Sequence, residues 1–327
     1  SDVSNRPGPI LNNQKVEYFH VMQKGGDFSG MCPTFAFIND STMATLSFGR
    51  ANTTLLLIDI KDKLEVLDYL KVPGRGSSAF ELAGKKGRSK IFSNTSGGAY
   101  SYISGKDHIF IPGANNNVLR VKIVDRKFDH KVETLDLKKQ IESGNLVDPR
   151  LSDKDQLNKL TALLPDVDGN LWFTSRQGII GLIHRTDKAA DGCYKVYSTF
   201  VGYYGLVEKM RKHYPESVAK AEELVKKINW ESMNTEVRRE LRTALKIDQD
   251  THEEIQNSFS IGPDGVYIVS NIALYKFRFN DETKKIEMDP KWLATFNQTG
   301  DQIYPNDGIQ KAGQLNDGSG TTPTLMD

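Results

Sequence analysis

The sequence predicts an all-β fold made of repeats, and two observations predict it. An apolar strand, a Gly/Asp/Asn turn, a second strand, a short polar loop and a third strand occur four times, in Pro33–Ile60, Gly98–Val124, Thr161–Arg185 and Asn257–Phe279. Steps of 66, 62 and 95 residues separate the starts of the second strands, at Met43, Ile109, Leu171 and Val266. A fixed period of about 64 residues is the signature of radially repeated sheets. The sequence therefore predicts a β-propeller.

Each repeat continues into a fourth strand, which completes a blade. The fourth strands are expected to begin near Leu64, His130, Cys193 and Lys285. In such a fold the loops from the second to the third strand, and from the fourth strand to the next blade, lie on one face around a central channel. We therefore expect ligand-binding residues in those loops.

The long step between the third and fourth blades predicts a helical insert over residues 204–250. Gly205–His213 fits a short helix, Pro215 suits a helix start, and a further helix is expected to carry Val237, Leu241 and Leu245 on one face. An apolar stripe in the second helix follows helical spacing, at Ala221, Leu224, Val225 and Ile228. The insert is interpreted as a lid or a partner surface, or alternatively as a decoration that caps blade edges.

A fifth repeat opens at Gly318, where the next innermost strand is due, with the sequence GSGTTPTLMD. The chain is therefore interpreted as one propeller domain over residues 1–327 that is incomplete at its C-terminus, because an unclosed propeller leaves a strand edge exposed. A C-terminal fragment or a second subunit would then complete the ring. The alternative is that residues 1–30, with the strand-like Val16–Met22, close a smaller ring.

Composition narrows the classes of function. With 43 basic and 42 acidic residues the formal charge is +1, which gives no reason to expect a nucleic-acid partner. No apolar stretch approaches the roughly 18 residues of a membrane span. The opening SDVSNRPGPI has no initiator Met, as expected either of a mature form or of a chain from which that residue was removed. Cys32 and Cys193 lie too far apart for a CxxC motif, so we expect them to be buried or paired with each other.

The predicted channel-face loops are rich in amides, hydroxyls and glycines, with two arginines and few carboxylates. Arginine is the natural bidentate partner of carboxylate or phosphate. These loops therefore predict a site for a polar, anionic small molecule or a glycan. The alternative is ordinary turn chemistry, in which Asn and Gly are common. The ligand-binding candidates are Arg50, Asn52, Asn94, Asn115, Asn116, Arg176, Gln177, Asn257 and Asn271.

Two chemistries are compatible with the residues of these loops. Calcium requires several oxygen ligands, which Asn257 and Glu254 could begin to supply. A hydrolase or lyase needs a positioned acid or base, for which His252 and Glu254 are the candidates. The segment PDVDGN, Pro165–Asn170, is predicted to be a hairpin turn on the opposite face rather than a metal loop.

The segments ALLPDVDGNLWFTSRQGIIGLI and SFSIGPDGVYIVSNIALYKF resemble blades of the gluconolactonase-like, strictosidine-synthase-like and quinoprotein-like propellers. The chain as a whole, especially the second segment and the later GQLNDGSGTTPTL, is similar to a family of secreted bacterial β-propeller proteins. This resemblance implies secretion or a periplasmic location. Members of the gluconolactonase-like group bind calcium through Glu, Asn and Asp side chains, so the resemblance to that group implies a calcium site. Asn257 matches that pattern, whereas the corresponding position in the third blade is Thr161.

Two functions from different classes follow. The first is a secreted or periplasmic protein that binds a polar ligand or glycan at the channel face, with hydrolysis or elimination as the reaction if it is an enzyme. The second is a non-enzymatic scaffold that uses the helical insert. A quinoprotein-like oxidoreductase is disfavoured, because the chain has only three tryptophans and its two cysteines are isolated.

Overall fold

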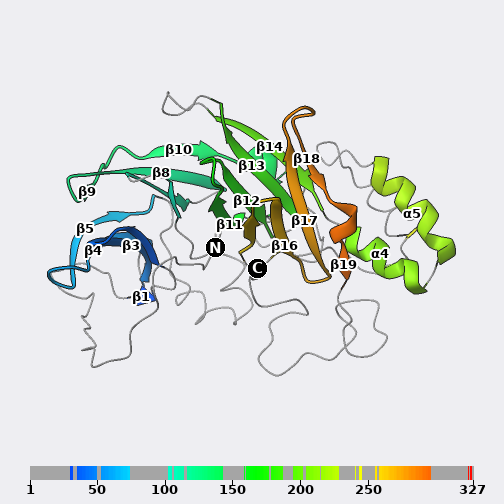
Figure 1. Ribbon diagram of the computed structural model, residues 1–327, viewed down its shortest axis with the longest axis horizontal. Coiled ribbons are helices and arrows are strands. Elements are labelled where there is room, and N and C mark those ends of the chain that lie inside the picture. The colour runs from blue at the N-terminus through cyan, green and yellow to red at the C-terminus, as the bar shows by residue number, and fades with distance from the viewer. Residues whose placement is uncertain are drawn as a thin grey trace, which may run out of the picture. The chain divides into compact units, whose positions relative to one another are not determined.

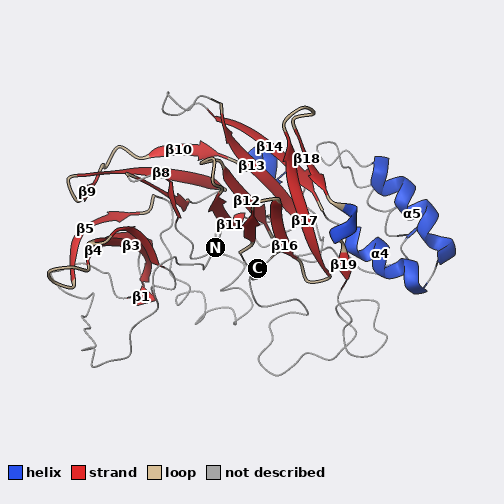
Figure 2. Cartoon of the chain, viewed as in Figure 1, coloured by secondary structure: helices blue, strands red, loops and turns tan. Residues whose placement is uncertain are grey.

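Strands dominate the computed structural model (Figures 1 and 2). The structure describes residues 30–31, 35–49, 53–73, 102–104, 107–113, 116–142, 158, 160–176, 178–186, 194–201, 204–213, 215–227, 240, 243–244, 255, 258–295, 323 and 325. The chain divides into two compact units, Ser1–Asp136 and Leu137–Asp327.

The first unit contains two antiparallel sheets. In the first sheet the order is β1-β3-β4-β5 with β2 also on β3, and the strands are β1 (Gly30–Met31), β2 (Phe35–Asn39), β3 (Thr42–Gly49), β4 (Thr53–Asp59) and β5 (Glu65–Lys71). In the second sheet the order is β10-β8-β7-β6 with β9 also on β8, and the strands are β6 (Tyr102–Ser104), β7 (His108–Pro112), β8 (Asn117–Val124), β9 (Lys127–Phe128) and β10 (Glu133–Asp136).

The second unit begins with α3 (Lys138–Glu142) and contains two more sheets. One has the order β11-β12-β13-β14, with β11 (Leu160–Pro165), β12 (Leu171–Ser175), β13 (Ile179–Arg185) and β14 (Tyr194–Phe200). The other has the order β15-β16-β17-β18 with β19 also on β17, and consists of β15 (Ser260–Gly262), β16 (Gly265–Val269), β17 (Ala273–Asn280), β18 (Lys285–Met288) and β19 (Ala294–Thr295). In the sequence, α4 (Tyr204–His213) and α5 (Pro215–Lys227) come between the strands of these two sheets.

Each sheet joins strands that follow one another in the chain, and the described pairings are antiparallel. Meanders of this kind are the blades of a propeller. The predicted fold class is confirmed: the chain is all-β and propeller-like. Four blades lie within the described residues, and the total blade number stays a prediction.

The apolar faces of neighbouring blades pack on each other within each unit. In the first unit, one buried cluster combines Leu46, Leu55 and Leu57 of the first blade with Ile111 and Val121 of the second. The central strand β4 is buried along its whole length, as expected for a strand covered on both faces. In the second unit, the rings of Tyr197 on β14 and Phe279 on β17 lie 4.8 Å apart, centroid to centroid. Burial of these faces supplies the main driving force for blade packing.

The predicted helices at Gly205–His213 and from Pro215 form as α4 and α5. Val207, Val218 and Ala221 are buried, and Arg211 of α4 bonds Glu208 and, across the pair, Glu222 of α5. Of the further helix expected around Val237, Leu241 and Leu245, the structure describes Glu240, Thr243 and Ala244, which are helical, whereas the three named residues lie outside the described part of the chain. No helix in the described part of the chain is long and apolar enough to cross a membrane.

The fourth strand of the fourth blade differs from its prediction. The sequence predicted one strand from Lys285, whereas the structure has β18, a 3₁₀ turn η2 (Pro290–Trp292) and β19. Pro290 cannot donate a backbone hydrogen bond to the sheet, and the Asp289 side chain accepts from the Lys291 amide to begin the turn.

Candidate functional site

Three of the predicted site residues lie in the described part of the chain: Asn116, Arg176 and Asn271. The other candidates lie outside it: Arg50, Asn52, Asn94, Asn115, Gln177, His252, Glu254 and Asn257. Their ligand-binding, catalytic and metal roles therefore stay predictions. Within the described residues no group of three or more His, Cys, Asp or Glu side chains is placed to hold a metal ion.

In the first unit, Asn116 shapes the turn between β7 and β8. Its backbone is left-handed, with φ of 61°, and its side chain is buried. Asparagine is one of the few residues that tolerates this conformation. The Gly113 amide donates to the Asn117 carbonyl at 2.7 Å and closes the turn. This geometry agrees with the turn-chemistry alternative for Asn116.

In the second unit, Arg176 sits in the turn between β12 and β13. The buried Ser175 hydroxyl accepts from the Ile179 amide at 3.0 Å, and Gly178 has a φ of 88°. Gly178 donates its amide to the Ser175 carbonyl at 3.2 Å. A glycine at this position is required by the left-handed backbone. The turn is thus closed by its own serine and glycine, and the half-buried Arg176 is carried at its tip.

In the corresponding turn of the fourth blade, between β16 and β17, a serine hydroxyl again accepts hydrogen bonds from backbone amides. The buried Ser270 hydroxyl accepts from the amides of Ile272 at 3.1 Å and Ala273 at 3.0 Å. The Ser270 amide donates to the Ala273 carbonyl at 2.9 Å. Asn271 lies at the tip and is buried. Serine side chains that satisfy turn amides hold the backbone in one conformation.

A main-chain bond connects the β12–β13 turn to the segment that leads into the fourth blade. The Ile255 amide donates to the Arg176 carbonyl at 2.9 Å, and Ile255 is buried. The segment that leads into the third blade is fixed as well, because Asn158 donates its side-chain amide to the Ile141 carbonyl at 2.9 Å. The second unit therefore has a rigid main-chain frame that carries a guanidinium at this end of its sheets.

The segment predicted as a hairpin turn, Pro165–Asn170, forms that turn. Asp166 accepts from the amides of Asp168 at 3.0 Å and Asn170 at 2.9 Å, and from the Trp172 indole at 3.2 Å. The turn joins β11 to β12, as predicted. Its carboxylate is used to close the turn.

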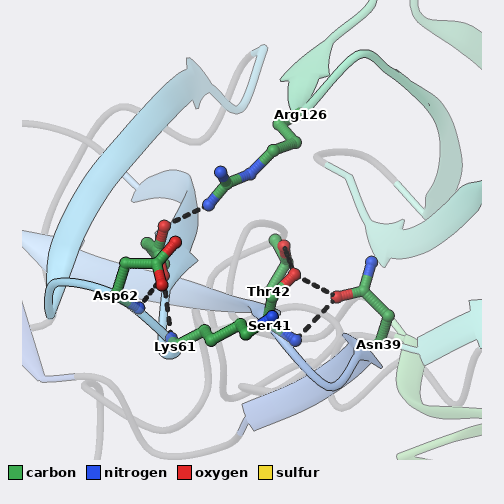
Figure 3. A network of polar contacts seen from close by, with 7 residues as sticks. Asn39, Ser41, Thr42, Lys61, Asp62 and Arg126 are labelled. Carbon is green, nitrogen blue, oxygen red and sulfur yellow. Dashed lines mark hydrogen bonds and ion pairs between the residues drawn. The ribbon is translucent and has the colours of Figure 1, made fainter.

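Figure 3 shows a network of polar contacts in the first unit, with Lys61, Asp62 and Arg126 among its members. Asp59 accepts from the amides of Lys61 at 2.8 Å and Asp62 at 3.1 Å, and it pairs with the Arg126 guanidinium. The Lys61 amide and then Arg126 hold the pKa of Asp59 below its usual value. Asp125 and Arg126 both have left-handed backbones, as in the two-residue turns that favour hairpins. Because Arg126 belongs to the second blade, the pair links the two blades of this unit.

A second polar cluster, which was not predicted, lies on the fourth blade. Lys276 of β17 is buried and donates to Asp264 at 2.5 Å. The Tyr267 hydroxyl donates to the same carboxylate at 2.8 Å. The hydrogen bond from Lys276 lowers the pKa of Asp264, and the same bond raises the pKa of Lys276. The one signal in the sequence is a lysine at the centre of an apolar strand, ALYKFRF, where an unpaired charge would be costly.

No family model and no curated protein matches the chain. Solved structures do match, at low similarity. A protein from Lactobacillus plantarum aligns at 7% identity and a TM-score of 0.42, over 78% of this chain and 53% of that one. The β-propeller domain of Cps50 (Swd1) from Myceliophteria thermophila aligns at 8% identity and a TM-score of 0.36, over 80% of this chain and 56% of that one. BamB from Moraxella catarrhalis aligns at 10% identity and a TM-score of 0.37, over 78% of this chain and 48% of that one.

The chain thus spans about half the length of these structures. At such TM-scores they carry no argument about function, and the fold assignment rests on the four consecutive meander sheets. The fold is that of a β-propeller.

Proposed function

We propose that this propeller binds a polar, anionic small molecule or an acidic glycan at the β12–β13 and β16–β17 turns of its second unit. The observation that carries the proposal is Arg176, a half-buried guanidinium on a turn held by Ser175, Gly178 and the Ile255 amide. A carboxylate ligand would receive charge-assisted hydrogen bonds from the arginine. The proposed location is secreted or periplasmic, as the resemblance to secreted bacterial propellers implies.

The predicted amides beside this turn would complete the site. Asn271 lies at the tip of the neighbouring blade's turn, and Gln177 and Asn257 are expected at the same end of these blades. Amide groups can donate to and accept from hydroxyls, whereas the arginine can only donate. A ligand with both a carboxylate and hydroxyl groups, such as a uronic acid, fits this donor set. Hydrolysis or elimination of such a ligand would require His252 or Glu254, and calcium would require Asn257 and Glu254.

Isothermal titration calorimetry with galacturonate, glucuronate and citrate tests the proposal, with galactose as the neutral counterpart. We expect the wild-type chain to bind at least one of the anions. Arg176→Ala should weaken that binding about 10- to 100-fold, as expected for the loss of a charged hydrogen-bond donor. The melting temperature should change little, because the bond from Ile255 ends on the Arg176 main chain.

Arg278→Ala is the matched control. Arg278 is on β17 of the same unit, its side chain is 66% exposed, and it pairs with Glu287 at 3.7 Å. It should leave the affinity unchanged. The proposal is wrong if no anion binds to the wild-type chain, if Arg176→Ala binds normally, or if both variants lose affinity equally.

The α4–α5 pair supports a second candidate function, as a surface for a partner protein. The bonds from Arg211 to Glu208 and Glu222 fix the two helices as one hairpin, and they raise the pKa of Arg211. Arg211, Lys220 and Glu223 are exposed on it. Charge reversal of Lys220 to Glu should abolish pull-down of a partner and leave galacturonate binding intact. If the variant still captures the same partner, the hairpin is not the working surface.

A further inference from the structure

The fourth blade interrupts its outer strand in a way that the first and third blades do not. Strand β18 ends at Met288 and β19 resumes at Ala294, and both pair with β17. The Asp289 amide donates to the Lys276 carbonyl at 2.9 Å, after which the chain leaves the sheet as the turn η2. The equivalent strands β5 and β14 run unbroken for seven residues each. The residues of η2, including Trp292, therefore lie outside the pairing of β18 and β19 with β17.

The aromatic residue of this turn is Trp292. Its ring lies 5.1 Å from the Tyr267 ring, centroid to centroid, at an interplanar angle of 79°. The Lys276 ammonium lies 5.5 Å from the Trp292 centroid and 5.8 Å from that of Tyr267. Edge-to-face and cation–π contacts of this geometry are favourable and hold the indole in place. Trp292 is nevertheless 43% exposed, so part of a fixed aromatic surface faces solvent.

Two carboxylates share the single ammonium beside this tryptophan. Lys276 contacts Asp264 at 2.5 Å and Asp289 at 3.7 Å. The Asp264 side chain is 57% exposed, while that of Lys276 is 10% exposed. Hydrogen-bond acceptors of Asp264 are therefore presented to solvent, whereas the Lys276 ammonium is covered.

We propose that Trp292, Asp264 and Asp289 form a surface site for a neutral saccharide residue. The axial C–H groups of a pyranose would stack on the fixed indole, which offers a large apolar surface at little entropic cost. The carboxylates would accept hydrogen bonds from the sugar hydroxyls, and bonds to an ionised acceptor are the stronger kind. The Lys276 ammonium is covered and already held by the two carboxylates, so the groups left for a ligand are the indole face and the carboxylate oxygens, which suit the C–H groups and hydroxyls of a neutral sugar.

This site is separate from the one proposed at Arg176. Asp264 lies in the turn between β15 and β16, at the opposite end of strand β16 from Ser270. A glycan with neutral and acidic residues could bind to both sites, but each site is tested by a separate substitution. Arg176→Ala should therefore leave binding of a neutral saccharide unchanged.

Titration with four neutral oligosaccharides tests the proposal: the α1,4- and β1,4-linked glucose hexaoses, xylohexaose and the N-acetylglucosamine hexamer. Binding is followed by calorimetry and by tryptophan fluorescence on the full chain. We expect at least one of them to bind, with Trp292→Ala at least about 10-fold weaker. Trp292→Phe should retain part of the affinity because it keeps an aromatic face. Asp264→Asn should weaken binding because one acceptor loses its charge.

Tyr69→Ala is the matched control, because Tyr69 is an aromatic residue of similar exposure, 45%, on strand β5 of the other unit. It should bind like the wild-type chain. Circular dichroism would show whether each variant is folded. If Trp292→Ala does not fold, Trp292→Phe still tests the proposal. The proposal is overturned if none of the four saccharides binds, if folded Trp292 variants bind normally, or if Tyr69→Ala loses affinity to the same extent.

Discussion

Replacing Gly181 with alanine probes the packing that holds the proposed site. Gly181 on β13 pairs with Phe173 on β12, and the phenyl ring lies directly over the glycine. A Cβ atom at position 181 would lie 2.0 Å from Phe173 Cζ, 2.2 Å from Cε1 and 2.7 Å from Cε2. Carbon atoms normally approach to about 3.5–4.0 Å. The ring would therefore have to move by about 1.5 Å or more, although Phe173 is fully buried.

The expected cost is at the upper end of overpacking effects. Added methyl groups in a well-packed core typically cost about 1–3 kcal/mol, and here the obstacle is a whole ring. For a unit of this size, about 3 kcal/mol corresponds to a fall in melting temperature of about 6–12 °C. We expect this fall for Gly181→Ala by circular dichroism. The affinity of the protein for an anion should also fall, because the β12–β13 hairpin carries Arg176.

A double-mutant cycle separates the clash from other effects of the substitution. Phe173→Leu alone should cost about 1 kcal/mol through lost contacts. Combined with Gly181→Ala it makes room for the new methyl group, so the two changes should be less destabilising together than their sum by at least about 1 kcal/mol. A melting temperature of Gly181→Ala within about 1 °C of the wild type, or strict additivity in the cycle, would refute the reasoning.

The other predictions concern a titrating carboxylate and a turn. The folded pKa of Asp59 lies below its unfolded value, so its bonds stabilise the protein above about pH 4, and this stabilisation is lost as the pH falls further. Asp59→Asn should therefore lower the urea midpoint at pH 7, and the difference from wild type should shrink by pH 3; a constant difference would contradict it. Ser270→Ala leaves the amides of Ile272 and Ala273 without their shared acceptor and should cost about 1–3 kcal/mol in urea unfolding. An unchanged midpoint would show that these amides find other partners.

The repeat pattern predicted the architecture well because strand alternation and turn residues are local signals. The third repeat, Thr161–Arg185, was placed within one residue of β11–β13, and its turn at Asp166 forms as predicted. The helix from Pro215 begins where the proline permits it. These features depend on residues close together in the chain, so one sequence is enough to predict them.

The side-chain clusters could not be predicted in the same way. The partners of Lys276 come from three places, at Asp264, Asp289 and Trp292, and only the pairing of β16, β17 and the 3₁₀ turn brings them together. The pair of Asp59 and Arg126 likewise joins residues 67 positions apart. For Asn116 the sequence left two interpretations open, and its left-handed backbone agrees with the turn interpretation.

Hydrogen–deuterium exchange of the wild-type chain with and without saturating galacturonate tests the central proposal most directly. The account predicts slower exchange in peptides that cover residues 171–181 and 268–273, where the Ser175 and Ser270 turns lie, and no change in α5. This protection should disappear in Arg176→Ala. Protection confined to α4 and α5, or protection of the same turns that persists in Arg176→Ala, would contradict the account.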